Sequence, residues 1–447
     1  MERPLFEKVR AFRGGAYFAM PGHKSKALFD FGFADDITEI EGADNLLDPE
    51  GAILEAEAAI ARAYGTAASY LIPAGSTAAI KVALYAATRP GDKVLVQRGA
   101  HTAFFHAAVH LDLIPVYLPC GTDPKTGLFC GIDPKEVGRA LDADPEIAAV
   151  FLTSPDYFGG ILQLEEIARE VEARNKVLVV DEAHGAHLAF TPLSAYSAVR
   201  FAHYTVQSLH KTAPAMTGAA LLHTRCAGTE QAVRTGMRLF LSTSPSYLIM
   251  LSSEYAVAHM QAHSGEWHRI EDMRRTLTAA LPEGAIPTRS GHFAAIDGSK
   301  FLFRLPHRTG REIVRDCAER GVYLEMGDDR YALAILSPLN KEDEIRRLED
   351  VFREAEAGPY LPVRREVPYF HKRVELSPRA AFFAGREWVY IDDAVGRICA
   401  LPVTPYPPGI PRISYGERIA AGDLDFEGHE GVQGIKDGKV AVVKEEL

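Results

Sequence analysis

The lysine at position 211 stands in a segment whose composition favours amine chemistry. It belongs to Ser208-Leu209-His210-Lys211-Thr212 and precedes a nearly uncharged stretch that ends at Gly218. Apolar surroundings lower the pKa of a lysine, so that its amine is available as a nucleophile at neutral pH. The alternative is an ordinary surface lysine whose stem lies on apolar surface while its charge stays in water.

A carboxylate ends a buried apolar run thirty positions earlier. Asp181 closes the run Val177–Val180 and opens Asp-Glu-Ala-His-Gly-Ala-His, which ends at His187. A buried carboxylate needs a partner, such as a protonated ring nitrogen, and His184 is placed to contact a substrate. The alternatives are a helix-capping aspartate, or a metal site made by Glu182, His184 and His187. The spacing of these three is not the H-E-x-x-H of zinc proteases, and we expect no metal.

Two further segments complete the set. Ser76 and Thr77 follow Gly75 where a short apolar run meets a helical pattern, and such a helix start can bind an anion. The alternative for them is plain N-capping. His101 follows the apolar run Lys93–Gln97 and is either a ring-stacking imidazole or a partly buried histidine at a helix start. Phosphate donors, a flat imidazole, an acid for a pyridine nitrogen and a lysine for an aldehyde together match the needs of pyridoxal 5'-phosphate.

The elements around these residues must form a sheet. Short apolar runs alternate with helical patterns from about residue 46 to 265, which predicts an α/β domain with a mainly parallel sheet. Ligands of such sheets bind beyond the carboxyl ends of the strands, where all four segments fall. Residues 1–45 are rich in glycine breaks and predict an irregular arm. Residues 266–447 predict an α+β region with a proline-rich segment. Strands are expected at 93–97, 114–118, 148–153, 177–180, 204–208 and 219–223.

Composition excludes several other classes. The chain has 447 residues and a formal net charge of −11, the wrong sign for a nucleic-acid partner. No window approaches the ~18 apolar residues that a membrane helix needs. Its five cysteines are odd in number and include no C-x-x-C, which favours reduced thiols and a cytoplasmic protein. Residues 1–13 carry charges of both signs and do not resemble a secretory signal.

Several strings have a familiar order and spacing. They are Met20-Pro21-Gly22-His23-Lys24, Asp48-Pro49-Glu50-Gly51, Gly75-Ser76-Thr77, Thr153-Ser154-Pro155, Asp181 to His187, Ser208 to Thr212, Ser242-Thr243-Ser244-Pro245-Ser246-Tyr247 and Pro405-Tyr406-Pro407-Pro408-Gly409. With them the sequence resembles, nearly end to end, the bacterial ornithine/lysine/arginine decarboxylase family of fold-type-I pyridoxal-phosphate enzymes. The resemblance is to the shorter form, which lacks an N-terminal wing domain, and it implies an aspartate-aminotransferase-like fold.

The resemblance also implies roles for individual residues. Lys211 would form the Schiff base, Asp181 would pair with the pyridine nitrogen, His101 would stack on the ring and Ala183 would pack beneath it. The phosphate would be held by Ser76, Thr77, Ser208 and His210. His184 would lie near the substrate, and Lys211 or His210 would return a proton to it. Ser242 and Thr243 would reach the cofactor of a neighbouring subunit in a homodimer or dimer-based oligomer with shared active sites.

The implied activity is decarboxylation of a basic amino acid, arginine, lysine or ornithine, to the amine, a step of polyamine synthesis. The candidate acids for a distal cation are Asp36, Glu39, Asp44, Asp156 and Glu417. Asp156 stands where family members usually have a threonine, and Asn45-Leu46-Leu47 and Thr102 also depart from the usual residues. The amino acid therefore stays open. The alternatives are another fold-type-I outcome, either an aminotransferase with Arg379 or Arg397 on the carboxylate or a β-eliminating lyase, and a non-catalytic regulator of a decarboxylase.

Overall fold

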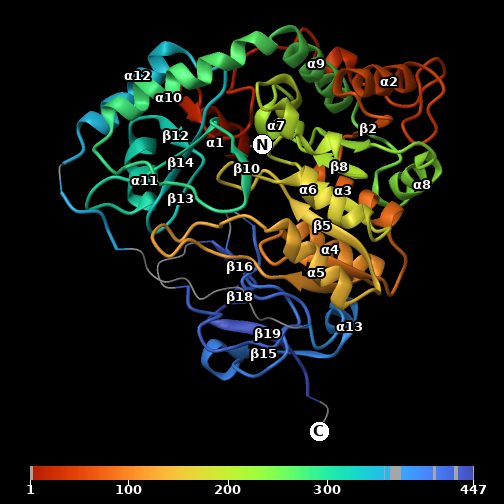
Figure 1. The fold of residues 1–447 in the computed structure, drawn as a ribbon. Helices are drawn as coiled ribbons and strands as arrows, with labels where there is room; N and C mark the ends of the chain where they lie inside the picture. The colour runs from red at the N-terminus through yellow and green to blue at the C-terminus, as the bar shows by residue number, and fades with distance from the viewer. Residues whose placement is uncertain (1–3, 357, 363–373, 406–408, 427–430, 446–447) are drawn as a thin grey trace.

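A seven-stranded sheet forms the centre of the molecule (Figure 1). The computed structural model describes residues 4–356, 358–362, 374–405, 409–426 and 431–445. The strands run in the order β2 (Ala68–Ile72), β9 (Ala220–Thr224), β8 (Tyr204–Gln207), β7 (Val177–Asp181), β5 (Ile147–Thr153), β3 (Lys93–Gln97) and β4 (Ile114–Leu118). The strand β9 runs antiparallel to β2 and β8, and all other neighbours in this sheet pair in parallel. The prediction of a mainly parallel sheet in an α/β fold is confirmed.

The apolar runs become strands because both faces of the sheet are buried. Side chains alternate between faces along a strand. Val179 accordingly belongs to one core, while Leu178 and Val180 belong to another. Helices build these two layers, in agreement with the predicted alternation of apolar runs and helical patterns. They are α2 (Ala52–Tyr64), α3 (Gly75–Ala87), α4 (Thr102–Leu111), α5 (Pro134–Ala143), α6 (Leu164–Glu172) and α8 (Glu230–Phe240).

A second core lies beyond the sheet. Two helices that the sequence reading did not identify, α9 (Tyr247–Ala262) and α10 (Arg269–Ala280), cross the top of Figure 1 toward it. The predicted α+β unit follows, and β10 crosses back to pair with β6 of the first unit. The strand β6 spans Gly160–Leu162. The elements of the α+β unit are β10 (Phe293–Ile296), β11 (Lys300–Phe303), α11 (Gly310–Glu319), β12 (Val322–Leu324), β13 (Met326–Gly327), β14 (Ala332–Ile335) and α12 (Glu342–Arg353).

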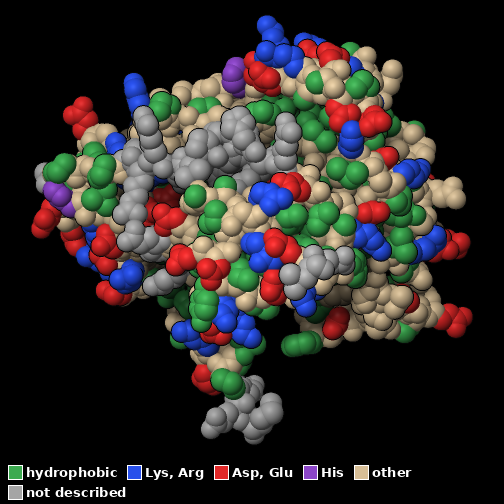
Figure 2. All heavy atoms as spheres, turned by 90° about the horizontal axis from the view of Figure 1, so that it is seen from below, with side chains coloured by type: hydrophobic (Ala, Val, Ile, Leu, Met, Phe, Trp, Pro, Cys, Tyr) green, Lys and Arg blue, Asp and Glu red, His purple; other side chains and the backbone are tan. Residues whose placement is uncertain are grey.

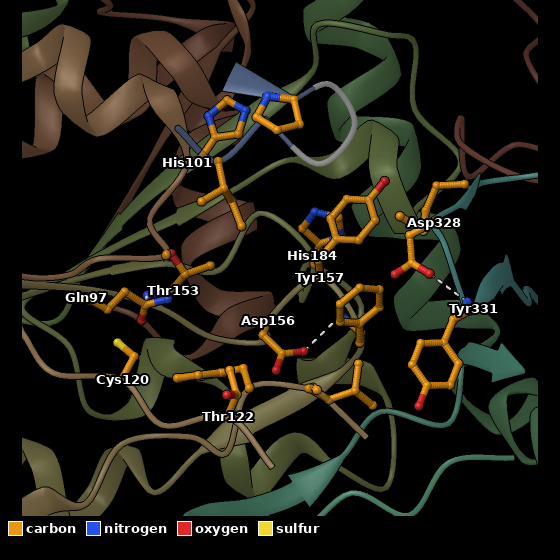
Figure 3. Close-up of a pocket in the computed structure, with 18 of the residues that line it drawn as sticks. Gln97, His101, Cys120, Thr122, Thr153, Asp156, Tyr157, His184, Asp328 and Tyr331 are labelled. Atoms are coloured by element: carbon orange, nitrogen blue, oxygen red, sulfur yellow. Dashed lines mark hydrogen bonds between the residues drawn. The ribbon is translucent and has the colours of Figure 1, made fainter. Parts of the chain in front are cut away.

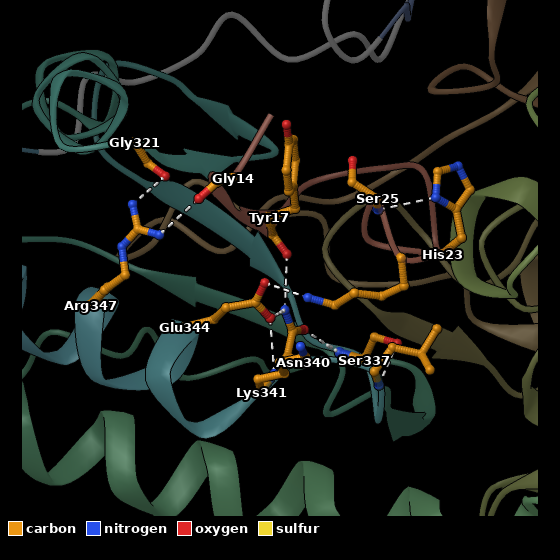
Figure 4. Close-up of polar contacts among 12 residues, drawn as sticks. Gly14, Tyr17, His23, Ser25, Gly321, Ser337, Asn340, Lys341, Glu344 and Arg347 are labelled. Atoms are coloured by element: carbon orange, nitrogen blue, oxygen red, sulfur yellow. Dashed lines mark hydrogen bonds and ion pairs between the residues drawn. The ribbon is translucent and has the colours of Figure 1, made fainter. Parts of the chain in front are cut away.

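The N-terminal arm is more ordered than predicted. Residues 4–18 contain α1 (Pro4–Arg10) and β1 (Ala16–Phe18), so the expectation of an irregular segment is wrong there. The strand β1 pairs in parallel with β12, more than three hundred positions away. Asn340 Nδ2 donates to the Tyr17 carbonyl at 3.0 Å (Figure 4). Lys26 Nζ contacts Glu344 Oε1 at 2.6 Å. No local sequence pattern predicts such a strand, because its hydrogen-bond partners lie more than three hundred positions away in the sequence.

The C-terminal segment lies below the main sheet and forms two small sheets, one of β15, β19 and β18 and one of β16 and β17 (Figure 1). Its elements are α13 (Pro378–Phe383), β15 (Arg386–Tyr390), β16 (Thr404–Pro405), β17 (Val432–Gln433), β18 (Ile435–Lys436) and β19 (Lys439–Val443). Arg98 joins it to the main domain. The guanidinium donates to the carbonyls of Pro411 and Arg412 and pairs with Glu417 at 2.9 Å. Residues 406–408 of the proline-rich string lie outside the described residues.

The surface is of mixed charge where Figure 2 views it. Lys and Arg side chains intermingle with Asp and Glu side chains on this face. Among the described helices, none combines the length and apolar character that crossing a bilayer requires.

Candidate active site

The carboxyl ends of the parallel strands gather the residues singled out from the sequence. Asp181 is the last residue of β7, Thr153 the last of β5, and Ser208 directly follows β8. The register pairs Thr153 with Asp181 on adjacent strands. His101 follows β3 at the same edge, because β3 runs parallel to β5.

A cavity of about 290 Å³ opens at this edge. Five of the residues predicted to bind the cofactor or act on the substrate line it: His101, Asp181, Ala183, His184 and Lys211. The opposite wall comes from the α+β unit and carries Asp328 and Tyr331, which Figure 3 shows across the cavity from Thr153. The cavity therefore lies between the main sheet and the second core, a common position for a ligand site.

The amine of Lys211 meets an imidazole at the base of the cavity. Lys211 belongs to the short helix α7 (Leu209–Thr212), and its Nζ lies 3.1 Å from His184 Nε2. Burial lowers the pKa of Lys211, although Asp181 and Glu325 oppose the shift. Burial likewise raises the pKa of the Asp181 carboxyl, against the attraction of Lys211. Asp181 Oδ1 accepts from the Ala183 amide at 3.1 Å.

His101 lies at a helix start, as one interpretation expected, and also faces the cavity, where a ring could lie against it. Its Nδ1 accepts from the Ala103 amide at 3.2 Å, so it caps α4, and its ring lines the cavity. Burial, followed by repulsion from Lys211, lowers the pKa of His101 to about 4. The imidazole is therefore neutral at physiological pH, with its proton on Nε2 because Nδ1 is an acceptor.

The expected phosphate donors lie near the cavity without lining it. The Gly75 amide donates to the Gly218 carbonyl at 2.8 Å, which joins the start of α3 to the loop before β9. His210 Nδ1 lies 3.3 Å from both Ser208 Oγ and the Ala219 carbonyl in that region. Ser76 and Thr77 stand in the first turn of α3, and Ala74, with no side-chain cap, precedes it. The capping alternative for Ser76 and Thr77 is therefore wrong.

Other predicted residues lie outside the cavity. Ser242 and Thr243 are exposed in the single chain. Glu182 turns away and accepts from Ser197, Ala198 and Gln207. His187 contacts Asp297 at 3.2 Å and stacks on Trp267. Among the described residues, no three His, Cys, Asp or Glu side chains are grouped to hold a metal.

Of the five candidate acids, only Asp156 lines the cavity. Its Oδ2 pairs with Arg289 at 2.6 Å, and its Oδ1 accepts from the Phe158 and Gly160 amides. Glu417 is paired with Arg98, and Asp44 accepts from three backbone amides at the start of α2. Neither Arg379 nor Arg397 lines the cavity. The substrate-facing acids were thus the weakest part of the sequence reading.

Sequence reasoning missed the groups that the second core contributes. Lys300 Nζ, from that part of the chain, lies 3.1 Å from His184 Nδ1. Tyr157 comes from the loop between β5 and β6 of the main domain, and its ring lies edge-on to that of His184 with the ring centroids 5.1 Å apart. Tyr157 Oη donates to Glu325 at 2.7 Å. The available signal for Lys300 was its position directly before the apolar run Phe301-Leu302-Phe303, at the start of a buried strand. Asp328 lies in the turn before β14 and carried no comparable signal.

Comparisons with known proteins agree with this geometry. The family profile described as "Orn/Lys/Arg decarboxylase, major domain" matches residues 4–280, and the "Orn/Lys/Arg decarboxylase, C-terminal domain" profile matches residues 372–426. The chain is 30% identical to the uncharacterized protein YaaO of Bacillus subtilis, over 94% of this chain and 92% of YaaO. It is 29% identical to an arginine decarboxylase of Halalkalibacterium halodurans, over 95% and 92%.

The fold has solved counterparts. The crystal structure of the Francisella novicida lysine decarboxylase LdcF superposes with a TM-score of 0.76 at 20% identity, covering 89% of this chain and 72% of that one. The expected fold of the pyridoxal-phosphate-dependent decarboxylases and transferases is confirmed. With both family profiles matched in order along the chain, the protein belongs to the Orn/Lys/Arg decarboxylase family and is a decarboxylase.

Proposed function

We propose that the protein decarboxylates a basic amino acid, arginine, lysine or ornithine, using pyridoxal 5'-phosphate held on Lys211. One observation carries the proposal: a lysine amine and a buried carboxylate share one cavity at the carboxyl edge of the sheet, in a chain of this family. The cofactor, when bound, accepts the electron pair that the departing carboxylate leaves behind.

The residues present fit that cofactor. Thr153 Oγ1 is buried beside the cavity and has no hydrogen-bond partner among the described residues, as expected of a group that faces a ligand. Asp181 would keep the pyridine nitrogen protonated, and the neutral His101 ring would lie against the cofactor. Ala183 would offer only a methyl group to the cofactor. Ser76, Thr77, Ser208 and His210 would hold the phosphate.

Lys211 is the better candidate for returning a proton to the substrate. Its Nζ faces the cavity and has His184 as an immediate neighbour, whereas His210 does not line the cavity. An amine of lowered pKa is suited to give and take a proton near neutral pH. Lys211 would thus act twice, first as the group that holds the cofactor and then as the acid.

Asp328 is our candidate for the distal cation of the substrate. Its Oδ1 accepts from the amides of Arg330 and Tyr331, which fixes the carboxylate in the cavity wall. Asp328 Oδ2 has no partner in the described part of the chain, whereas Asp156 is already paired with Arg289. Asp328 would then distinguish basic amino acids from neutral ones by a charge-assisted hydrogen bond.

We further propose that the site is shared in a homodimer. Ser242, Thr243 and Ser244 are exposed and lie outside the cavity of their own chain, which leaves them available to a neighbouring subunit. Mixing a Lys211→Ala chain with a Ser242→Ala/Thr243→Ala chain would test this. Recovered activity in the mixture supports a shared site, and additive loss contradicts it.

The activity test uses purified protein, a panel of amino acids, trapped carbon dioxide and a mass measurement of the product. We expect carbon dioxide and the matching amine from one of the three basic amino acids. Asp328→Asn should lower kcat/KM for that substrate by about tenfold to a hundredfold, the value of one hydrogen bond to a charge. Borohydride reduction followed by peptide mapping should label Lys211. A keto acid without carbon dioxide would instead indicate an aminotransferase, and labelling of another lysine would refute the site.

A further inference from the structure

The His184 imidazole lies between two lysine amines that come from different parts of the chain. Its Nε2 is 3.1 Å from Lys211 Nζ, and its Nδ1 is 3.1 Å from Lys300 Nζ. Lys211 follows β8 of the main sheet, whereas Lys300 opens β11 of the second core. His184 itself follows β7 and is buried against the ring of Tyr157. The three groups therefore form a continuous chain of contacts that spans both cores.

Hydrogen bonding restricts how many protons this chain of contacts can hold. Burial and the neighbouring lysines lower the pKa of His184 far below its ordinary value, so its ring is neutral. A neutral imidazole has one N–H donor and one acceptor nitrogen, while an ammonium group can only donate. Both contacts are satisfied only if at least one of the two amines is neutral and accepts. At most one of Lys211 and Lys300 is an ammonium while these contacts hold.

Burial and packing fix the position of the Lys300 side chain beside the His184 imidazole. Its side chain is 2% exposed, and its stem packs on Gly159, where an added Cβ would come within 3.0 Å of Lys300 Cβ and Cγ. Burial lowers the pKa of Lys300 to about 8. The charged groups that act on Lys300 are Asp297, Glu325, Asp156 and Lys211, and Lys24 also repels it. Those that act on Lys211 are Asp181 and Glu325.

We propose that Lys300 is a positioning residue that sets the tautomer of His184 and, through it, the protonation state of the Lys211 amine. While Lys300 is an ammonium it donates to Nδ1, so that the imidazole proton is on Nε2 and points at a neutral Lys211. Transfer of one proton from Lys300 to Nδ1, with release of the Nε2 proton to Lys211, leaves Lys300 neutral and Lys211 protonated. One N–H bond breaks and one forms at each step, and the total charge is unchanged.

This exchange deepens the proposed function and rests on it. Lys211 must be a neutral amine to bond a carbonyl carbon, and it must carry a proton when it acts as an acid. Lys300, which contacts Lys211 through one imidazole, can give this proton to Lys211 and take it back without bulk water.

The test measures the amine of Lys211 directly. The full-length protein, stripped of cofactor, is treated with trace acetic anhydride across a pH series, and labelling of the Lys211 peptide is compared with that of the exposed Lys125. Lys300→Met frees His184 to accept from Lys211, which should raise the apparent pKa of Lys211 by about one unit and lower labelling at pH 7 roughly tenfold. Lys300→Arg keeps a donor at Nδ1 and should restore the profile, even if the methionine variant folds poorly.

Two further variants separate coupling from general charge loss. Lys24→Met removes another fully buried lysine, whose Nζ donates to the Ala19 carbonyl at 2.7 Å, and should change Lys211 labelling much less. His184→Phe removes both ring nitrogens, so adding Lys300→Met to it should have little further effect. In the loaded enzyme, Lys300→Met should lower kcat and change KM by less than about twofold.

Two results would overturn the inference. One is an unchanged labelling profile for Lys300→Met, and the other is full additivity of the His184 and Lys300 variants, which would place the effect outside the imidazole. Labelling needs no decarboxylation, so the two proposals fail separately. Absence of carbon dioxide release would end the proposed function and leave the labelling result standing.

Discussion

Replacing Arg98 by Met tests what joins the C-terminal region to the main domain. The Arg98 and Glu417 side chains are 1% and 0% exposed, and Arg98 also donates to the carbonyls of Pro411 and Arg412 at 2.8 and 3.1 Å. Without Arg98, the Glu417 carboxylate stays buried, and the Ser414 amide still donates to its Oε2. Breaking a buried pair from one side costs about 3–5 kcal/mol. For a chain of this length that free energy corresponds to a fall of ~4 °C in Tm.

The assay is thermal unfolding followed by circular dichroism, with two comparison variants. Arg98→Met/Glu417→Gln removes the stranded charge and should recover roughly half of the loss, because a glutamine oxygen can still accept from Ser414. Arg139→Met breaks the exposed pair with Glu136 and should cost less than about 1 kcal/mol. If Arg98→Met lowers Tm no more than Arg139→Met does, the reasoning about burial is wrong.

Two further predictions concern the lysine loop and acid stability. Gly22→Ala would place a Cβ 2.4 Å from the Ala213 carbonyl oxygen and displace the loop that carries Lys211. Because a small misplacement of a catalytic group is costly, kcat should fall by about a hundredfold. Gly32→Ala, with open space around the new methyl group, should leave kcat unchanged in the same assay. His223 is neutral in the fold because burial lowers its pKa from 6.5 to about 3. Between pH 6.5 and 3 the unfolded chain binds a proton at His223, whereas the native state does not. The free energy of unfolding that His223 contributes is therefore complete above pH 6.5 and is lost as the pH falls toward 3. The Tm of His223→Gln should decline less steeply over that range, and parallel curves would contradict the assignment.

Local sequence was sufficient for the main sheet and for the residues at its edge. Strands β3 and β4 have the predicted bounds, and the others differ by one or two residues. Because both faces of the sheet are buried, each parallel strand is a short apolar run, and such a run can be recognised without knowing which strand pairs with it. Asp181, His184 and Lys211 were found for the same reason: each follows such a run, and the carboxyl ends of parallel strands meet at one edge.

Tertiary structure alone decided the far wall of the cavity and the state of its charges. Lys300 contacts His184 across 116 positions of sequence, and β1 pairs with β12 across a still longer span. Such contacts depend on how two cores dock, and no short-range periodicity encodes that. The sequence placed an acid at Asp156 but could not show that Arg289 neutralises it, nor that Asp328 faces the cavity. A side chain's type is written in the sequence, whereas its partner and its exposure to water, which set its pKa and its chemistry, belong to the fold.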